Sequence, residues 1–333
     1  MSSILKHAFV LACIGPLFSC SDLFVNMKNV GIMMVGDSLV DHQYLALVKW
    51  KILDPRNVFH SRSACYNEPQ TVEELILAAL SHLGRPPELV YLNFQALHHL
   101  HLHPIRPWVT TETCSCRAND QCTAGFWGNF LLEEWVKDVV HQYLHSPLLA
   151  NATSLPVVIL MTPNAICEEK FYGQYRDWFD SAEENYQQCA SWLQSTYVAH
   201  CGRGSVSRDC NWTFVGQPSW RSQLRVDSLL ASRRFSSHTN DRIESLCRDG
   251  VFGRNGSLNI ATRMRRVLDP STPKPDSGAW SRVGLLDAFA LTEAAGCDHT
   301  NDGRHYDSSV IDKQVDELAR VYNLLRERGL AGA

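Results

Sequence analysis

A serine with the surroundings of a nucleophile lies near the start of the chain. An apolar run, 30–34, leads into Gly36-Asp37-Ser38, and apolar residues at helical spacing follow from Leu39. This pattern predicts a buried strand that turns sharply into a helix. Such a turn places the Ser38 hydroxyl at a sheet edge and at a helix N-terminus, where free backbone N–H groups favour negative charge. A serine nucleophile needs this placement, because its attack on an ester generates an oxyanion. Gly-Asp-Ser also occurs in ordinary turns, where Asp and Ser cap helices.

A base for this serine is expected near the end of the chain. Asp302 and His305 are three residues apart in a turn that contains glycine. At that spacing a carboxylate can orient an imidazole and select its tautomer, and the imidazole can then take a proton from Ser38. The residues thus predict a serine–histidine–aspartate relay. Two alternatives remain open, a solvated polar loop and a competing pair formed by Asp298 and His299.

The rest of the chain predicts the scaffold that would bring these residues together. Strands that alternate with helices imply a parallel sheet covered on both faces, with the active site at the carboxyl ends of the strands. Ser38, Asn93, Thr162 and the segment after Leu291 fall at that edge. Besides the first strand and helix, we predict strands at 57–61, 89–92, 157–161 and 283–291, and helices at 71–83, 126–144, 181–199 and 310–326.

Length and composition bound the class of protein. With 333 residues and a net charge of −4, the chain can form one large domain and is no nucleic-acid binder by bulk charge. Residues 201–280 are polar, rich in arginine and weakly periodic, and we interpret them as an insertion in a domain spanning 22–333. Their arginines could hold an anionic glycan or form a solvated face, and Trp108, Trp127 and Trp178 could stack on sugars or pack in the core.

The N-terminus and the cysteines predict the secretory pathway. Lys6, the apolar run 8–18 and small residues up to Ser21 form the pattern of a signal peptide, 1–21. An uncleaved anchor is the alternative, and only then would the protein meet a membrane. Cleavage leaves an even number of cysteines, which suits complete disulfide pairing of unknown connectivity in the Golgi lumen or outside the cell. Sequons at Asn151, Asn211 and Asn255 agree.

Two boxes resemble a known superfamily. Gly36-Asp37-Ser38-Leu39-Val40-Asp41-His42-Gln43 and Asp302-Gly303-Arg304-His305 resemble the SGNH/GDSL hydrolases, and within them the PC-esterase group, which includes the trichome-birefringence-like proteins. The resemblance implies a flavodoxin-like three-layer α/β/α sandwich with a central parallel sheet. It also implies Ser38 as nucleophile, His305 as base and Asp302 as the acid that orients it.

The resemblance further implies an oxyanion hole. Asn93 stands in place of the family's third-block asparagine, although the usual preceding glycine is absent, and it could instead only cap a strand end. The second-block glycine has no clear match, because Ser61-Arg62-Ser63-Ala64-Cys65 occupies its place. The backbone N–H of Ser38 is the other expected donor.

No metal or other cofactor is expected. His98, His99, His101 and His103 follow Asn93, but they lack carboxylate or cysteine partners at ligand spacing. We therefore expect a carbohydrate O-acetyltransferase that takes an acyl donor and a glycan. A carbohydrate O-acetylesterase with the same relay and a non-catalytic glycan-binding protein that kept the fold are the alternatives.

Overall fold

The computed structural model describes residues 24–51, 53–62, 69–93, 132–149, 155–180, 253–269, 271–272 and 277–331. These residues form a parallel sheet of five strands in the order β2-β1-β3-β4-β5. This order is compatible with a flavodoxin-like arrangement, and the predicted α/β class is confirmed. The strands are β1 (Ile32–Gly36), β2 (Val58–Arg62), β3 (Leu89–Asn93), β4 (Val157–Met161) and β5 (Val283–Leu286).

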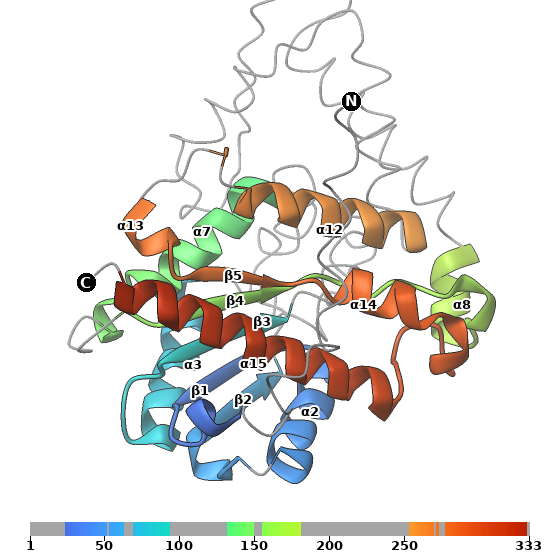
Figure 1. Ribbon diagram of the computed structural model, residues 1–333. Helices are drawn as coiled ribbons and strands as arrows, with labels where there is room; N and C mark the ends of the chain where they lie inside the picture. The colour runs from blue at the N-terminus through green and yellow to red at the C-terminus, as the bar shows by residue number, and fades with distance from the viewer. Residues whose placement is uncertain are drawn as a thin grey trace, which may run out of the picture.

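Helices connect and cover the strands (Figure 1). The described α-helices are α2 (Ser38–Leu45), α3 (Pro69–Leu83), α7 (Leu132–Leu144), α8 (Gln174–Asp180), α12 (Arg254–Leu268), α13 (Ser277–Trp280), α14 (Ala288–Ala295) and α15 (Ser308–Ala331). A π-helical turn, Ala46–Trp50, continues α2. Short 3₁₀ turns lie at Val25–Met27, Pro55–Asn57, Pro147–Leu149, Glu168–Lys170 and Cys297–His299.

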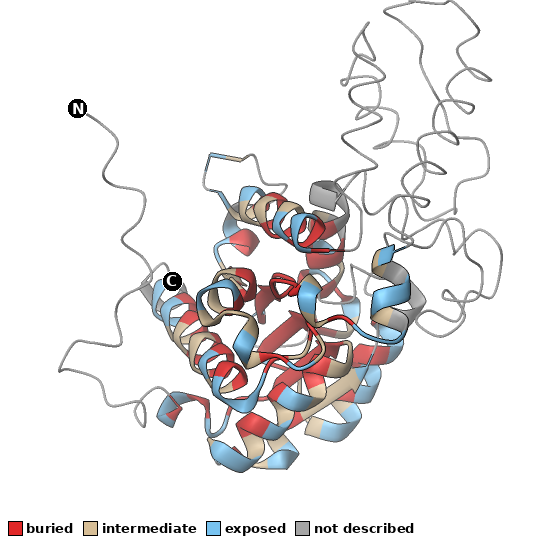
Figure 2. Cartoon of the chain, turned by 90° about the vertical axis from the view of Figure 1, so that its right-hand side faces the viewer, coloured by how far each residue is buried: buried red, intermediate tan, exposed pale blue. Residues whose placement is uncertain are grey.

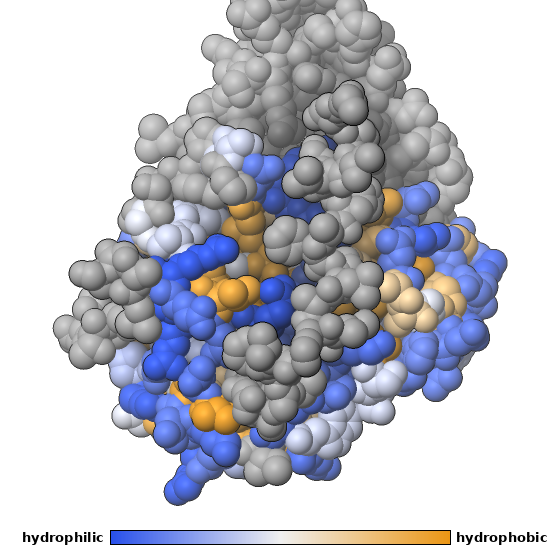
Figure 3. Space-filling view, viewed as in Figure 1, coloured by the Kyte–Doolittle hydropathy of each residue, from blue (hydrophilic) through white to orange (hydrophobic). Residues whose placement is uncertain are grey.

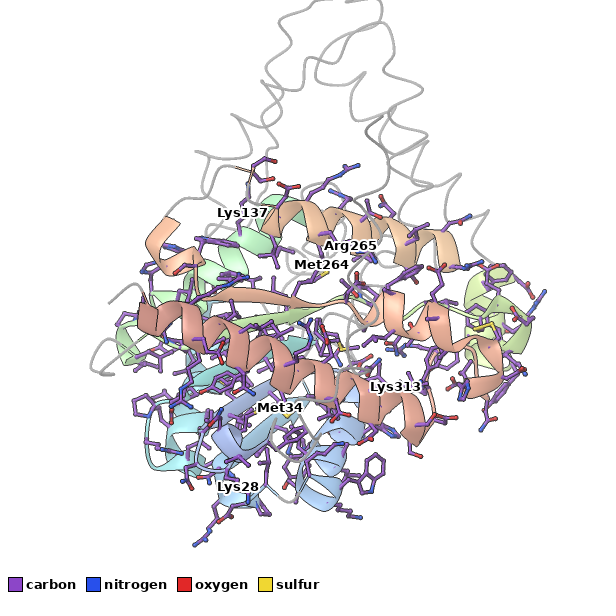
Figure 4. The ribbon with its side chains drawn as sticks, in the orientation of Figure 1. Lys28, Met34, Lys137, Met264, Arg265 and Lys313 are labelled. Atoms are coloured by element: carbon purple, nitrogen blue, oxygen red, sulfur yellow. A yellow bond between two sulfur atoms is a disulfide. The ribbon has the colours of Figure 1, made fainter. Side chains whose placement is uncertain are left out.

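Two apolar clusters lie on opposite faces of the sheet and make a three-layer arrangement. One cluster joins the strands to α3, α7 and α12, and the other joins them to α2 and α15. Met264 of α12 and Met34 of β1, both labelled in Figure 4, belong to these two different clusters. Strands β1, β3 and β4 are buried along their whole length, as expected for continuous apolar runs in a parallel sheet.

Burial follows this layering. Buried residues gather along the strands and the inner sides of the helices, whereas exposed residues lie on the outer sides (Figure 2). On the face seen in Figure 3, hydrophilic residues cover most of the described surface, and hydrophobic residues show in smaller areas. No helix of the described residues is long and apolar enough to span a membrane. Residues 1–21 lie outside the described part, as does the predicted helix 181–199.

The predicted strand 283–291 is wrong in its second half. The strand β5 ends at Leu286, and α14 begins at Ala288. Asp287 caps this helix, because its carboxylate accepts a hydrogen bond from the backbone N–H of Ala290. A short apolar run does not distinguish a buried strand from a buried helix, which explains the error.

The predicted insertion 201–280 does not extend through α12. This helix buries Ile260, Met264 and Val267 against the sheet, so it belongs to a covering layer. The arginines of α12 make the composition of the segment polar, and this conceals the apolar face of the helix. Some of these arginines lie outside that face. Arg265, for example, pairs with Asp287 at an Nε–Oδ2 distance of 2.7 Å. Residues 201–252 lie outside the described part of the chain.

Candidate active site

Ser38 is the first residue of α2, directly after the carboxyl end of β1. Asp37 precedes it in an extended conformation, and the Asp37 carboxylate accepts a hydrogen bond of 3.0 Å from the backbone N–H of Leu39. This is a helix N-cap, and it leaves Ser38 in the first turn, at the positive end of the helix dipole. The strand order reverses between β1 and β3, and ligand sites of open α/β sheets lie at such a point.

The structure brings Ser38, His305 and Asp302 together. Ser38 Oγ lies 2.7 Å from His305 Nε2, across 267 positions of sequence. His305 Nδ1 lies 2.6 Å from Asp302 Oδ2. Because a carboxylate accepts the proton on Nδ1, Nε2 is left with a lone pair that can accept the proton of the serine hydroxyl. Such an arrangement can activate Ser38 as a nucleophile.

Asp302 is fixed by its own loop. Its Oδ1 atom accepts hydrogen bonds from the backbone N–H of Arg304, at 2.9 Å, and of His305, at 2.7 Å. Burial raises the pKa of Asp302, but the hydrogen bonds from the His305 side chain and from these two backbone groups outweigh burial, so that the pKa lies well below its usual range. Asp302 is therefore a carboxylate at neutral pH.

Glycine is required at position 303. Its φ is +79°, and a Cβ atom there would lie 2.3 Å from the carbonyl oxygen of Cys167. The Gly303 carbonyl also accepts a hydrogen bond of 2.9 Å from the backbone N–H of Cys167. The loop that carries His305 is thus held closely against the segment that follows β4.

A buried ion pair joins this loop to the start of α2. The Arg304 guanidinium contacts Asp37 Oδ2 through Nη2 and donates to the Tyr175 hydroxyl through Nη1, at 3.2 Å. The Arg304 side chain is only 4 % exposed and the Asp37 side chain 12 %. Since Asp37 adjoins Ser38 and Arg304 adjoins His305, this pair helps to hold Ser38 and His305 beside each other.

Asn93 ends β3, beside the glycine that precedes Asp37. A Cβ atom on Gly36 would lie 2.6 Å from Asn93 Cβ, so glycine is what lets the asparagine side chain lie against the end of β1. Asn93 is fully buried, and its Nδ2 atom donates to Gln43 Oε1 at 3.2 Å. Its place at the switch point is the one expected for an oxyanion-hole donor; that role remains a prediction.

The competing pair is not formed. His299 Nδ1 lies 2.8 Å from Asp307 Oδ2, and not beside the carboxylate of Asp298. A hydrogen bond from Ser309, together with that from His299, lowers the pKa of Asp307 to about 2. This pair is exposed at the surface and joins the start of α15 to the preceding turn.

Several residues of the sequence predictions are not among those described. The residues that lie outside the described part of the chain are His98, His99, His101 and His103, Trp108 and Trp127, and residues 63–65 of the second block. The described end of that block, Arg62, pairs with Asp41 of α2.

Among the described residues, one group of potential metal ligands lies close together: Cys167, Glu169 and Cys297. The two cysteines form a disulfide, with a Cα–Cα distance of 5.6 Å. Their sulfur atoms are therefore not thiolates, and this group does not have the ligands of a zinc site.

Sequence reasoning missed four residues that shape the site: Arg304, Tyr175, Gln43 and Gln314. Arg304 and Gln43 lie inside the two boxes that resemble the family, and this position was a sign that they belong to the site. Their hydrogen-bond partners could not be predicted from the sequence. Tyr175, whose ring lies with its centroid 6.3 Å from that of His305, carried no local signal. Gln314 lies on the buried side of α15, where a polar residue among apolar ones was the only sign.

Comparisons of the chain with protein-family models, with curated proteins and with solved structures give no match.

Proposed function

We propose that the protein is a serine-dependent acyl-ester enzyme with the SGNH hydrolase fold, of the PC-esterase type, and that it transfers acetyl groups to carbohydrate. The observation that carries the proposal is the pair of hydrogen bonds Ser38 Oγ–His305 Nε2, at 2.7 Å, and His305 Nδ1–Asp302 Oδ2, at 2.6 Å. Their place at the carboxyl edge of the sheet, at the reversal of strand order, supports it further.

In the first half of the reaction, Ser38 Oγ attacks the acyl carbon of the donor ester while its proton passes to His305 Nε2. Asp302 stabilises the imidazolium that forms. The oxyanion is held by the backbone N–H of Ser38 and by Asn93. The C–O bond to the donor alcohol then breaks, the alcohol takes the proton from His305, and the acyl group stays on Ser38.

In the second half, a sugar hydroxyl attacks the acyl carbon and gives its proton to His305. The bond to Ser38 Oγ breaks, and the serine recovers the proton. Water in place of the sugar hydroxyl would give hydrolysis through the same steps. The two outcomes differ in whether the acceptor excludes water from the acyl-enzyme.

Covalent labelling tests the proposal. A fluorophosphonate probe should label the wild-type protein, and Ser38→Ala and His305→Ala should abolish labelling and the hydrolysis of 4-nitrophenyl acetate. Ser309→Ala is the matched control, because Ser309 also contacts a histidine, His299, but in the exposed pair. Labelling of Ser38→Ala equal to that of the wild type would falsify the nucleophile assignment.

Product analysis separates transferase from esterase. With an acetyl ester as donor and oligosaccharides as acceptors, a transferase yields acetylated sugar by mass spectrometry, whereas an esterase yields free acetate alone. Release of acetate at the same rate with and without acceptor would exclude transfer to the sugars tested.

A further inference from the structure

A row of buried side-chain amides connects the two parts of the candidate site. Asn93 Nδ2 donates to Gln43 Oε1 at 3.2 Å, and Gln43 Nε2 donates to Gln314 Oε1 at 2.9 Å. Gln314 Nε2 donates to Asn164 Oδ1 at 2.9 Å, and Asn164 Nδ2 donates to the carbonyl oxygen of Arg304 at 3.3 Å. We call Asn93, Gln43, Gln314 and Asn164 the carboxamide chain.

The members of the chain come from four elements and share deep burial. They lie at the end of β3, on α2, on α15 and in the segment after β4, and none is more than 2 % exposed. A buried polar group without a partner is costly, and the hydrogen bonds between these four side chains help to offset that cost. The low local dielectric also strengthens each bond in a connected row.

All four amides point in the same sense. Between neighbours in the row, the NH₂ group of one residue donates to the side-chain oxygen of the next. The row ends at the backbone carbonyl of Arg304, which can only accept. Turning one amide over would set oxygen against oxygen on one side and NH₂ against NH₂ on the other. The Arg304 carbonyl therefore fixes the orientation of Asn164, and through Gln314 and Gln43 that of Asn93.

Gln43 is held from further directions. Its Oε1 atom also accepts a hydrogen bond of 3.0 Å from the Tyr91 hydroxyl, and its Nε2 atom lies 3.2 Å from the sulfur of Met161. With both ends of this amide engaged, Gln43 has one orientation, and it offers an acceptor to Asn93.

The two ends of the carboxamide chain lie near the residues of the relay. Asn93 lies against Gly36, two residues before Ser38, and Arg304 directly precedes His305. Arg304 also contacts Asp37 through its side chain, so the row of amides and this ion pair both reach residues next to the relay.

We propose that Gln43 and Gln314 are positioning residues that set the Asn93 amide with its NH₂ group as the oxyanion donor. This inference rests on the proposed function. If the Asn93 amide turned over, its oxygen would replace its NH₂ group and would repel the developing oxyanion. The residues thus act on the transition state through Asn93, without contact to substrate.

Steady-state kinetics on 4-nitrophenyl acetate tests the inference. We expect Gln43→Met to lower kcat about tenfold or more and Gln314→Met about fivefold, with KM changed less than about twofold, because an oxyanion donor acts in the transition state. Gln314→Met keeps the size of the side chain and does not touch Asn93, so it serves where Gln43→Met fails to fold. Ser257→Ala is the matched control: Ser257 lies on α12, is fully buried, and its hydroxyl donates to the carbonyl oxygen of Gly253 at 3.0 Å. It should lower the melting temperature and leave kcat unchanged.

A double-mutant cycle identifies the route of the effect. If Gln314 acts through Asn93, then Gln314→Met should change kcat little in an Asn93→Ala background. An equal loss of kcat in both backgrounds, or a normal kcat in folded Gln314→Met, would overturn the inference while leaving the Ser38 relay in place. A wild-type protein without Ser38-dependent turnover would instead overturn the proposed function, and the inference with it.

A measurement on the wild type needs no variant. Fluorophosphonate modification of Ser38 places a phosphonyl oxygen where the oxyanion would lie. The side-chain NH₂ resonances of Asn93, Gln43 and Gln314 should then shift in nuclear magnetic resonance spectra, and that of Gln142 on α7 should not. Unshifted resonances of Asn93 and Gln314 in labelled protein would contradict the inference.

Discussion

At the scale of single residues, Asp302 decides whether His305 can act as a base. The carboxylate accepts from Nδ1, which leaves Nε2 facing the Ser38 hydroxyl as an acceptor. The same carboxylate also accepts two backbone N–H groups. One side chain therefore selects both the tautomer of the histidine and the shape of the loop that carries it.

Asp302→Asn should abolish most activity without unfolding the protein. The asparagine NH₂ group would donate to Nδ1 and so favour the tautomer with a proton on Nε2, which cannot accept from Ser38. We expect kcat to fall about 10⁴-fold in an ester hydrolysis assay, as is typical when the acid of such a relay becomes an amide. A kcat within tenfold of the wild type would contradict the assigned role.

The same variant should change the response of stability to acid. The folded pKa of Asp302 lies below its unfolded value, which is about 3.9 for a free aspartate. Its contribution to stability is therefore present above that pH and is lost as the pH falls through the folded pKa. Denaturant melts between about pH 2 and 5 should show a shallower loss of stability in Asp302→Asn than in the wild type.

At the scale of elements, the N-terminus of α2 serves two purposes. Asp37 caps the helix with one oxygen and pairs with Arg304 through the other. The helix that presents Ser38 is thereby anchored to the loop that presents His305.

Asp37→Asn separates these two purposes. Asparagine caps helices about as well as aspartate, so the cap should survive, whereas Arg304 is left as a buried charge without its ion partner. We expect the free energy of unfolding to fall by about 3–5 kcal/mol, as measured by denaturant titration. The Ser38–His305 contact should also loosen, and kcat should fall.

Asp54→Asn is the matched control for this variant. Asp54 likewise accepts the backbone N–H two residues on, from Arg56, and pairs with the arginine side chain, but that guanidinium is 88 % exposed. Exposed ion pairs contribute little, so this change should hardly alter stability. If the two substitutions lowered the free energy of unfolding equally, the buried Asp37–Arg304 pair would contribute no more to stability than an exposed ion pair.

At the scale of the whole molecule, the Cys167–Cys297 disulfide ties the chain together. It joins the segment after β4 to the turn before the loop that contains His305, across 130 positions. The backbone N–H of Cys167 donates to Gly303, so the cross-link also supports the loop that contains His305. The prediction of disulfides agrees with this pair; the remaining cysteines lie outside the described residues.

Cys297→Ser should lower the free energy of unfolding by about 4–5 kcal/mol, because the cross-link removes a long loop from the unfolded state. Denaturant titration of the variant and of the wild type, each with and without reductant, measures the difference. Reductant should destabilise the wild type by a similar amount. Thiol counting on denatured, unreduced protein should find neither Cys167 nor Cys297 free, and a reactive thiol at either position would contradict the disulfide.

Local patterns in the sequence determined most of the scaffold and the identity of the relay candidates. Continuous apolar runs predicted β1, β3 and β4, since buried parallel strands carry no alternation. Helical spacing predicted α3 and the core of α15. The two boxes marked Ser38, Asp302 and His305, because the residue types and their spacing are themselves part of the chemistry.

Only the tertiary structure decided which residues are partners. The Asp37–Arg304 pair, the carboxamide chain and the Cys167–Cys297 disulfide all join residues that lie far apart in the sequence. The end of β5 at Leu286 was equally undecided, because the same apolar run can be buried as a strand or as a helix. Such contacts depend on how whole elements pack, and sequence periodicity reports only which face of one element is buried.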